Sequence, residues 1–243
     1  MSRVEDRAVE ISAFLEVPYD DVLERLSAGF HHNHALVAED FNSFGADVDD
    51  EKSLLDWYRS TDAYIYELTA YHVEEGFNYS GMCDGIAQHL STAGKPDVLT
   101  LGDGIGDLTI RLAKEGLNPT YHDLAGSLTW KFADYRFHIV DVRCHYMLTA
   151  SFAPNLMGEY DAVVALDFLE HVVNVSAWVE RVHEVLRPGG VFLAQNAFGI
   201  GDMEHGNSIP MHLAVNNKYV DEWVSLVDEV GFDSPGNGWL VKR

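Results

Sequence analysis

Three alternating glycines, Gly102, Gly104 and Gly106, follow a short apolar run that begins at Val98. The residues after them have helical spacing, so the sequence predicts a strand that turns sharply into a helix. Glycine suits such a turn because it lets the chain bend tightly and lets a ligand approach the bare backbone. Nicotinamide, flavin and adenosyl cofactors all use turns of this kind, so the motif predicts a cofactor site without identifying the cofactor.

A carboxylate follows at the end of the next expected strand, Thr120–His122. Asp123 lies about 20 residues after Gly102, a place from which a carboxylate can accept both ribose hydroxyls of an adenosine. The chain contains 39 Asp and Glu residues, so an acid can also fall there by chance. The combination with the glycine turn is therefore what favours an adenosine site.

Three histidines are candidates for a general base, because a neutral imidazole can accept a proton from a hydroxyl or an amine near neutral pH. His171 follows the expected strand Ala162–Ala165. His205 and His212 lie in a long polar stretch after the expected strand Val191–Ala194, and His212 is the preferred base. For each of them a local structural role is the alternative.

Aromatic residues recur along the first part of the chain, with Trp57, Tyr64 and Tyr71 at every seventh position. Packing against the rest of the protein is one interpretation of this stripe. A lid that excludes water and holds a cationic amine is the other. The residues expected to bind substrate are Tyr64, Tyr71, Met211 and Tyr219.

Two further histidines, His31 and His34, are spaced to share a helical face. They would ligate a metal ion only if a third ligand joined them, and the sequence identifies none. We therefore predict no bound metal.

The pattern of apolar residues that predicts the surrounding secondary structure changes at Gly94-Lys95-Pro96. Residues 1–94 read as helices, with expected boundaries near 4–15, 19–41, 51–75 and 79–92. Beyond them, strands alternate with helices, which predicts βαβ units and a parallel sheet covered on both faces. The remaining expected strand is Val140–Tyr146, and the expected helices are Leu108–Lys114, Ser127–Arg136, Ala177–Val185 and Tyr219–Val230.

Over residues 95–243 the chain resembles the class I S-adenosylmethionine-dependent methyltransferases. Three stretches carry the resemblance: 101–106 with Asp123 after it, 160–172, and 185–193. The resemblance implies a Rossmann-like α/β fold with a doubly wound, mostly parallel sheet of the seven-stranded type. With the N-terminal helices counted, the domains would be a helical lid or extension over 1–94 and a cofactor-binding domain over 95–243.

The resemblance also implies that the cofactor is S-adenosyl-L-methionine and that the product is S-adenosyl-L-homocysteine. The enzyme would methylate an oxygen or nitrogen of a small metabolite or natural product. The implied cofactor-binding residues are Gly102, Asp103, Gly104, Gly106, Asp123, Leu124, Asp167 and Phe168. The chain departs from the family at Thr100, where an acid is usual, so Asp103 or Asp107 would have to substitute. Its short C-terminus implies an abbreviated strand hairpin.

The amino-acid composition excludes some classes of binding partner and favours one cellular compartment. The 16 Lys and Arg residues against 39 Asp and Glu give a net charge of −23, which argues against nucleic acids and anionic membranes. Two cysteines and a charged N-terminus favour the cytoplasm. A small-molecule substrate is expected, and a homodimer stays open. The alternatives are an enzyme like an aminopropyl transferase, a protein-modifying enzyme, and a non-catalytic adenosyl-binding protein.

Overall fold

The computed structural model describes residues 3–47, 49–172, 174–198, 219–236 and 238–243. The strands are β1 (Asp97–Leu101), β2 (Asn118–Leu124), β3 (His145–Thr149), β4 (Tyr160–Leu166), β5 (Leu186–Gln195), β6 (Phe232–Asp233) and β7 (Trp239–Lys242). The helices are α1 (Arg3–Leu15), α2 (Tyr19–Ser27), α3 (Phe30–Phe44), α4 (Glu51–Ser60), α5 (Ala63–Val73), α6 (Tyr79–Thr92), α7 (Asp107–Lys114), α8 (Leu128–Ile139), the short η1 (Leu169–His171), α9 (Val175–Val185) and α11 (Tyr219–Val230).

One seven-stranded sheet organises these elements, in the order β3-β2-β1-β4-β5-β7-β6. The first five strands in this order run parallel, β7 runs antiparallel to β5, and β6 runs antiparallel to β7. The closing hairpin is abbreviated as expected, since β6 has only 2 residues. The prediction of a mostly parallel, seven-stranded α/β sheet is confirmed.

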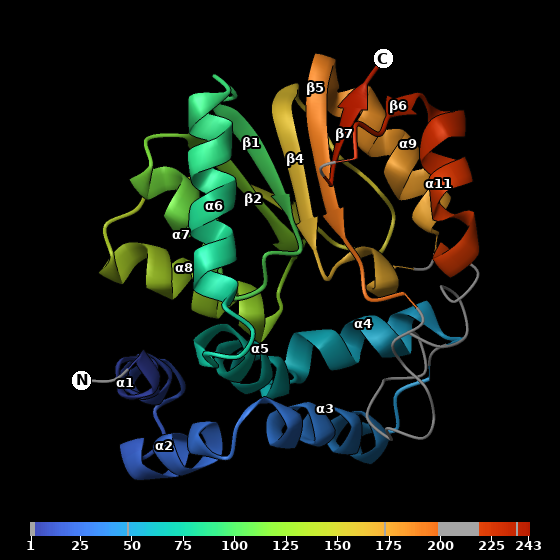
Figure 1. The fold of residues 1–243 in the computed structure, drawn as a ribbon. Coiled ribbons are helices and arrows are strands. Elements are labelled where there is room, and N and C mark those ends of the chain that lie inside the picture. The colour runs from blue at the N-terminus through green and yellow to red at the C-terminus, as the bar shows by residue number, and fades with distance from the viewer. Residues whose placement is uncertain (1–2, 48, 173, 199–218, 237) are drawn as a thin grey trace.

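Both faces of the central strands are buried, because consecutive side chains of a strand point to opposite sides. Val98 and Val164 pack in the cluster that contains α6 and α7, whereas Leu99 and Val163 pack in the cluster that contains α9 and α11. Figure 1 shows these helices on the two sides of the sheet. Full burial of such side chains stabilises a fold by about 1.5–3 kcal/mol each.

The helices α1 to α5 lie across the ends toward which the parallel strands point (Figure 1). Ala8 and Ile11 of α1 share a buried cluster with Ile65 of α5 and Phe132 of α8. Helix α6 differs from the others, because it packs directly on the sheet face beside α7. The division of the chain at residue 94 stays a prediction, and no helix within the described ranges is long and apolar enough to cross a membrane.

The expected strand over Val140–Tyr146 is wrong in its position. Val140 instead caps the end of α8, and the strand β3 begins only at His145. The reason is that β3 is an edge strand with His145, Tyr146 and Leu148 all exposed, so no alternation of buried and exposed residues marks it.

Two of the expected helices are each divided in two. Residues 19–41 are interrupted at Gly29, whose φ of 84° does not fit a right-handed helix. Residues 51–75 are interrupted at Thr61, which has an extended backbone and whose hydroxyl accepts the backbone N–H of Ala63 at 3.1 Å. Short breaks of this kind do not disturb the apolar spacing, which is why the sequence did not reveal them.

Two glycines at the ends of α7 allow a matched test of the turn. Gly106 precedes the helix with a φ of +79°, and an added Cβ would lie 2.6 Å from the ring of Phe137; Gly116 follows it with a φ of +83° and open space. We expect Gly116→Ala to lower the free energy of unfolding by about 1–2 kcal/mol through backbone strain alone. Gly106→Ala adds the clash with Phe137, so its loss should reach about 3 kcal/mol or more. Urea denaturation measures both, and equal losses would contradict the close packing of the turn.

Candidate active site

The glycine turn lies where β1 ends, in the middle of the parallel strands. Gly102, Gly104 and Gly106 have φ values of +60°, +52° and +79°, a left-handed conformation that residues with a Cβ rarely adopt. Close packing is a second requirement. A Cβ at Gly102 would lie 2.3 Å from the ring of Phe168, and one at Gly104 would lie 2.6 Å from a methyl group of Leu68.

Asp123 at the end of β2 faces this turn. Its Oδ2 accepts the backbone N–H of Gly104 at 3.1 Å and the hydroxyl hydrogen of Tyr121 at 3.0 Å. Its Oδ1 accepts the backbone N–H of Leu124 at 2.6 Å. The carboxylate is thus held beside the glycine backbone by three donors, in the place from which it can reach a ribose.

Two cavities open on either side of the glycine turn. The larger, of about 140 Å³, has mainly aromatic and apolar walls, with Tyr58, Tyr64, His122, Phe152, Phe168 and Trp178 among its lining residues. The smaller, of about 40 Å³, is lined by Tyr71, His72, Tyr79 and Asp103 among others. Leu68, Gly102 and Asp167 line both, so only a thin partition divides them.

Buried carboxyl groups give this region its electrostatic character. Burial raises the pKa of Asp103 to about 7 and that of Asp123 to about 6. Burial and the nearby Glu67 raise the pKa of Asp167 to about 6, and burial with Asp167 raises that of Glu170 to about 7. No lysine or arginine belongs to the described lining of either cavity. A cationic ligand would relieve the cost of these charges, because an opposite charge favours the ionised carboxylate.

Of the two acids considered as replacements for the one missing at Thr100, Asp103 lines the smaller of these two cavities, whereas Asp107 lines a separate cavity together with Arg7 and Arg136. It accepts the backbone N–H groups of Leu108 and Thr109 at the start of α7. Burial would raise the pKa of Asp107, but Arg7 and His72 outweigh it and lower that pKa to about 2.

Asp107 belongs to an ion-pair network at the start of α7. It pairs with Arg7, with Arg136 at 2.7 Å and with His72 at 2.7 Å. Arg136 also donates to the carbonyl of Ile105 within the glycine loop and to Glu10 of α1. Asp107 therefore holds the turn in place from behind, and it is not available to a ligand in the cavities.

The structure brings most of the expected site residues together. Those that line one or both cavities are Tyr64, Tyr71, Gly102, Asp103, Gly104, Asp123, Leu124, Asp167, Phe168 and His171. Gly106 caps α7 beside them. Tyr219 instead packs in the core cluster under α11, with its ring 5.7 Å from that of Phe198. His205, Met211 and His212 lie outside the described residues.

The histidine pair considered for a metal does not gather a ligand set. His34 Nδ1 lies 3.1 Å from Glu67 Oε1. Within the described ranges, no group of three or more His, Cys, Asp or Glu residues is arranged to hold a metal ion.

Among the residues of the larger cavity that sequence reasoning missed are Leu68, His122, Phe152 and Trp178. His122 carried a usable signal, because it directly precedes Asp123 at the end of a buried strand. The other three come from α5, from the β3–β4 connection and from α9, and only tertiary packing brings them to the cavity.

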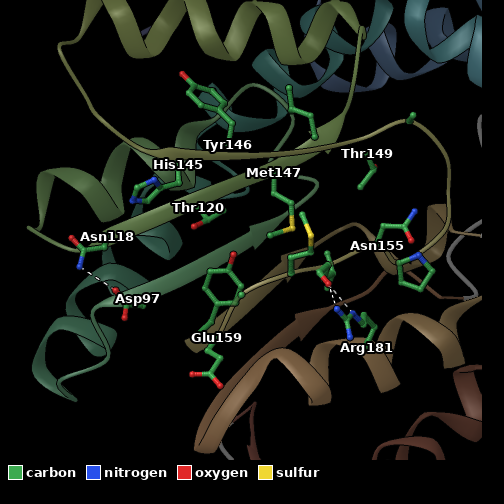
Figure 2. Close-up of a pocket in the computed structure, with 17 residues that line it drawn as sticks. Asp97, Asn118, Thr120, His145, Tyr146, Met147, Thr149, Asn155, Glu159 and Arg181 are labelled. Carbon is green, nitrogen blue, oxygen red and sulfur yellow. Dashed lines mark hydrogen bonds between the residues drawn. The ribbon is translucent and has the colours of Figure 1, made fainter.

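A hollow larger than both cavities, of about 1080 Å³, lies elsewhere. Figure 2 shows it along β3, with Asp97 and Asn118 at one end and Arg181 of α9 across from the strand. It exists because residues 150–159, which connect β3 to β4, form no helix over this face of the sheet. None of the three glycines of the turn lines it, so its size does not mark the candidate site.

The strand order, the glycine turn and the acid on the next strand together define a Rossmann-like nucleotide-binding fold. Comparison with known sequences makes the class more specific. Residues 99–192 match the family described as a methyltransferase domain. The resemblance to class I methyltransferases is confirmed.

The ubiquinone biosynthesis O-methyltransferase of Dechloromonas aromatica is 34% identical over 116 residues, which are 46% of this chain and 48% of that protein. The protein of the same name from Erwinia tasmaniensis is 32% identical over 111 residues, 44% of each chain. The chain thus matches about half the length of these curated relatives.

Solved structures agree on the fold. A putative O-methyltransferase from Nostoc punctiforme aligns with a TM-score of 0.57 at 17% identity, covering 87% of this chain and 71% of that one. The magnesium protoporphyrin IX methyltransferase of Synechocystis PCC 6803, with bound S-adenosylhomocysteine, aligns with a TM-score of 0.57 at 19% identity, covering 80% of this chain and 100% of that one.

The raised pKa of Asp167 has a consequence for stability. A carboxyl group whose pKa is raised by folding favours the native state below its unfolded pKa, and this contribution is lost as the pH rises through the folded value. Asp167 has a positive φ of 49°, which asparagine also tolerates. We expect Asp167→Asn to raise the free energy of unfolding by about 1–3 kcal/mol more at about pH 7.5 than at about pH 4.5.

Urea denaturation at the two pH values measures this difference. Asp84→Asn, which removes a carboxylate whose side chain is 57% exposed, serves as the control for the loss of a charge outside the site. An Asp167→Asn profile parallel to that of the wild type would show that the buried carboxyl does not titrate as described.

Proposed function

We propose that this protein transfers a methyl group from S-adenosylmethionine to an oxygen or nitrogen of a small-molecule acceptor. The observation that carries the proposal is the set of buried carboxyl groups around the glycine turn, with no lysine or arginine in the described cavity walls. S-adenosylmethionine bears a sulfonium and an ammonium group, which suit such surroundings. When bound, it supplies the methyl group and an excellent leaving group.

The roles of the cofactor-binding residues follow from their places along the sheet edge. Gly102 and Gly104 present bare backbone to the ligand, and Asp123 accepts the ribose hydroxyls. Asp103 and Asp167, next to the smaller cavity, face the amino-acid end of the ligand. The cavities must join to accept a molecule of this length, and the side chain of Leu68, which lines both, has to move for that.

The acceptor would lie against the aromatic wall of the larger cavity. Tyr58 and Tyr64 are stacked there, with ring centroids 5.6 Å apart and an angle of 6° between the planes. His171 is adjacent, with its ring centroid 6.5 Å from that of Tyr64, and we assign it the role of accepting the acceptor's proton. Aromatic walls exclude water and suit a flat acceptor. The names of the matched relatives favour oxygen as the acceptor atom.

Several further parts of the proposal stay predictions. His205 and His212 stay candidates for the base, and Tyr71, Met211 and Tyr219 stay candidates for substrate contacts. The net charge of −23 supports the absence of nucleic-acid and membrane partners. The free thiols of Cys83 and Cys144 favour the cytoplasm. A homodimer stays a prediction.

Asp123 provides the first test. We expect Asp123→Ala to weaken binding of S-adenosylhomocysteine roughly 100-fold, because two hydrogen bonds to a charged acceptor are lost. Isothermal titration calorimetry of the wild type and the variant measures this effect, and Asp84→Asn is the control that removes an exposed carboxylate. A folded wild-type protein that binds neither S-adenosylmethionine nor S-adenosylhomocysteine would refute the proposal. Binding would justify an acceptor screen led by phenols and amines.

A further inference from the structure

An unpartnered histidine forms part of the wall of the larger cavity. His122 on β2 is only 2% exposed, and neither of its ring nitrogens has a hydrogen-bond partner among the described residues. Its ring centroid lies 5.9 Å from that of Phe168 and 5.5 Å from that of Trp178, with interplanar angles of 83° and 76°, so it makes edge-to-face contacts with two aromatic rings. A buried polar group without a partner is unfavourable, and native proteins usually satisfy such groups or use them.

The order of the strands tells which part of a ligand would come to His122. Along the carboxyl edge, β4, β1, β2 and β3 follow one another and contribute Asp167, Gly102, Asp123 and Thr149 respectively to the larger cavity. In the proposed function the ribose binds at Asp123 and the amino-acid end lies toward Asp167. The purine base must then extend the other way, toward Thr149 and the β2 end where His122 lies.

The chemistry of His122 suits a purine. Burial lowers the pKa of His122 to about 4, so its imidazole is neutral at physiological pH. A neutral imidazole offers one N–H donor and one bare nitrogen acceptor. Adenine offers the complementary groups, an exocyclic amino donor and ring-nitrogen acceptors.

We propose that His122 forms a hydrogen bond to the adenine base of the ligand and makes this site selective for adenine. This inference rests on the proposed function. It adds a residue that determines specificity for the base. The glycine turn only presents bare backbone to the ligand and Asp123 binds the ribose, so neither distinguishes one base from another. A base that cannot make the bond leaves the histidine buried and unpaired, and this difference is the source of the selectivity.

Calorimetry with modified ligands tests the proposal. The probes are S-adenosylhomocysteine, its analogue with an oxo group in place of the exocyclic amine, and analogues in which C–H replaces one ring nitrogen. We expect the wild type to bind at least one analogue roughly tenfold more weakly than the parent. In His122→Phe the affinity for S-adenosylhomocysteine should fall by a similar factor, and the variant should no longer discriminate against that analogue.

Two controls separate a hydrogen bond from a packing role. His122→Gln keeps a donor and an acceptor, so it should restore part of the discrimination. Asp123→Asn should weaken all the ligands without changing their ratios. Equal weakening of every ligand by His122→Phe, or equal affinities of the wild type for all of them, would overturn the proposal.

A further measurement does not depend on a variant that folds. The ¹⁵N shifts of the His122 ring in the wild type should move to those of one fixed tautomer when S-adenosylhomocysteine is added, and unchanged shifts would overturn the assignment. If the wild type binds none of the probes, the proposed function fails instead, so the two failures are distinguishable.

Discussion

A single buried guanidinium fixes the geometry on which the candidate site depends. Arg136 is 2% exposed, and it binds the carbonyl of Ile105 inside the glycine loop, Asp107 at the start of α7 and Glu10 on α1. A charge removed from water to this extent is tolerated only when nearly all its donors are paired. The loop therefore keeps its shape only while α1, α7 and α8 are all in place. The N-terminal helices take part in positioning the glycines as well as in covering the cavities.

The β3–β4 connection has an equally specific effect on the larger cavity. Residues 150–159 form no helix, and hydrogen bonds from α9 hold this irregular segment in place. The indole N–H of Trp178 donates to the carbonyl of Phe152 at 3.0 Å, and Arg181 donates to that of Leu156. These bonds hold Phe152 in the wall of the cavity that His122 also lines. Because no helix forms over residues 150–159, the groove of Figure 2 stays open beside β3.

The features that could be predicted from the sequence are those that residues close together in the chain determine. The strands β1 and β4 are buried on both faces, so their apolar runs were recognisable. The glycine turn and Asp123 were recognisable because backbone conformation and strand ends impose them locally. The edge strand β3 has no such pattern, and it was placed several residues too early. Leu68, Phe152 and Trp178 reach the cavity only through packing between distant segments, which no spacing along the chain encodes.

The carboxyl groups of the site also show how folding and binding oppose each other here. Asp103, Asp123, Asp167 and Glu170 all have raised pKa values because they are buried, and ionising them at neutral pH therefore costs stability. A net charge of −23 adds repulsion over the whole molecule. Packing alone would favour neutral residues at these positions. A cationic ligand reverses the balance, since it binds where the folded chain has concentrated buried carboxyl groups. The same carboxyl groups that weaken the unliganded protein as the pH rises would then strengthen its hold on a sulfonium cofactor.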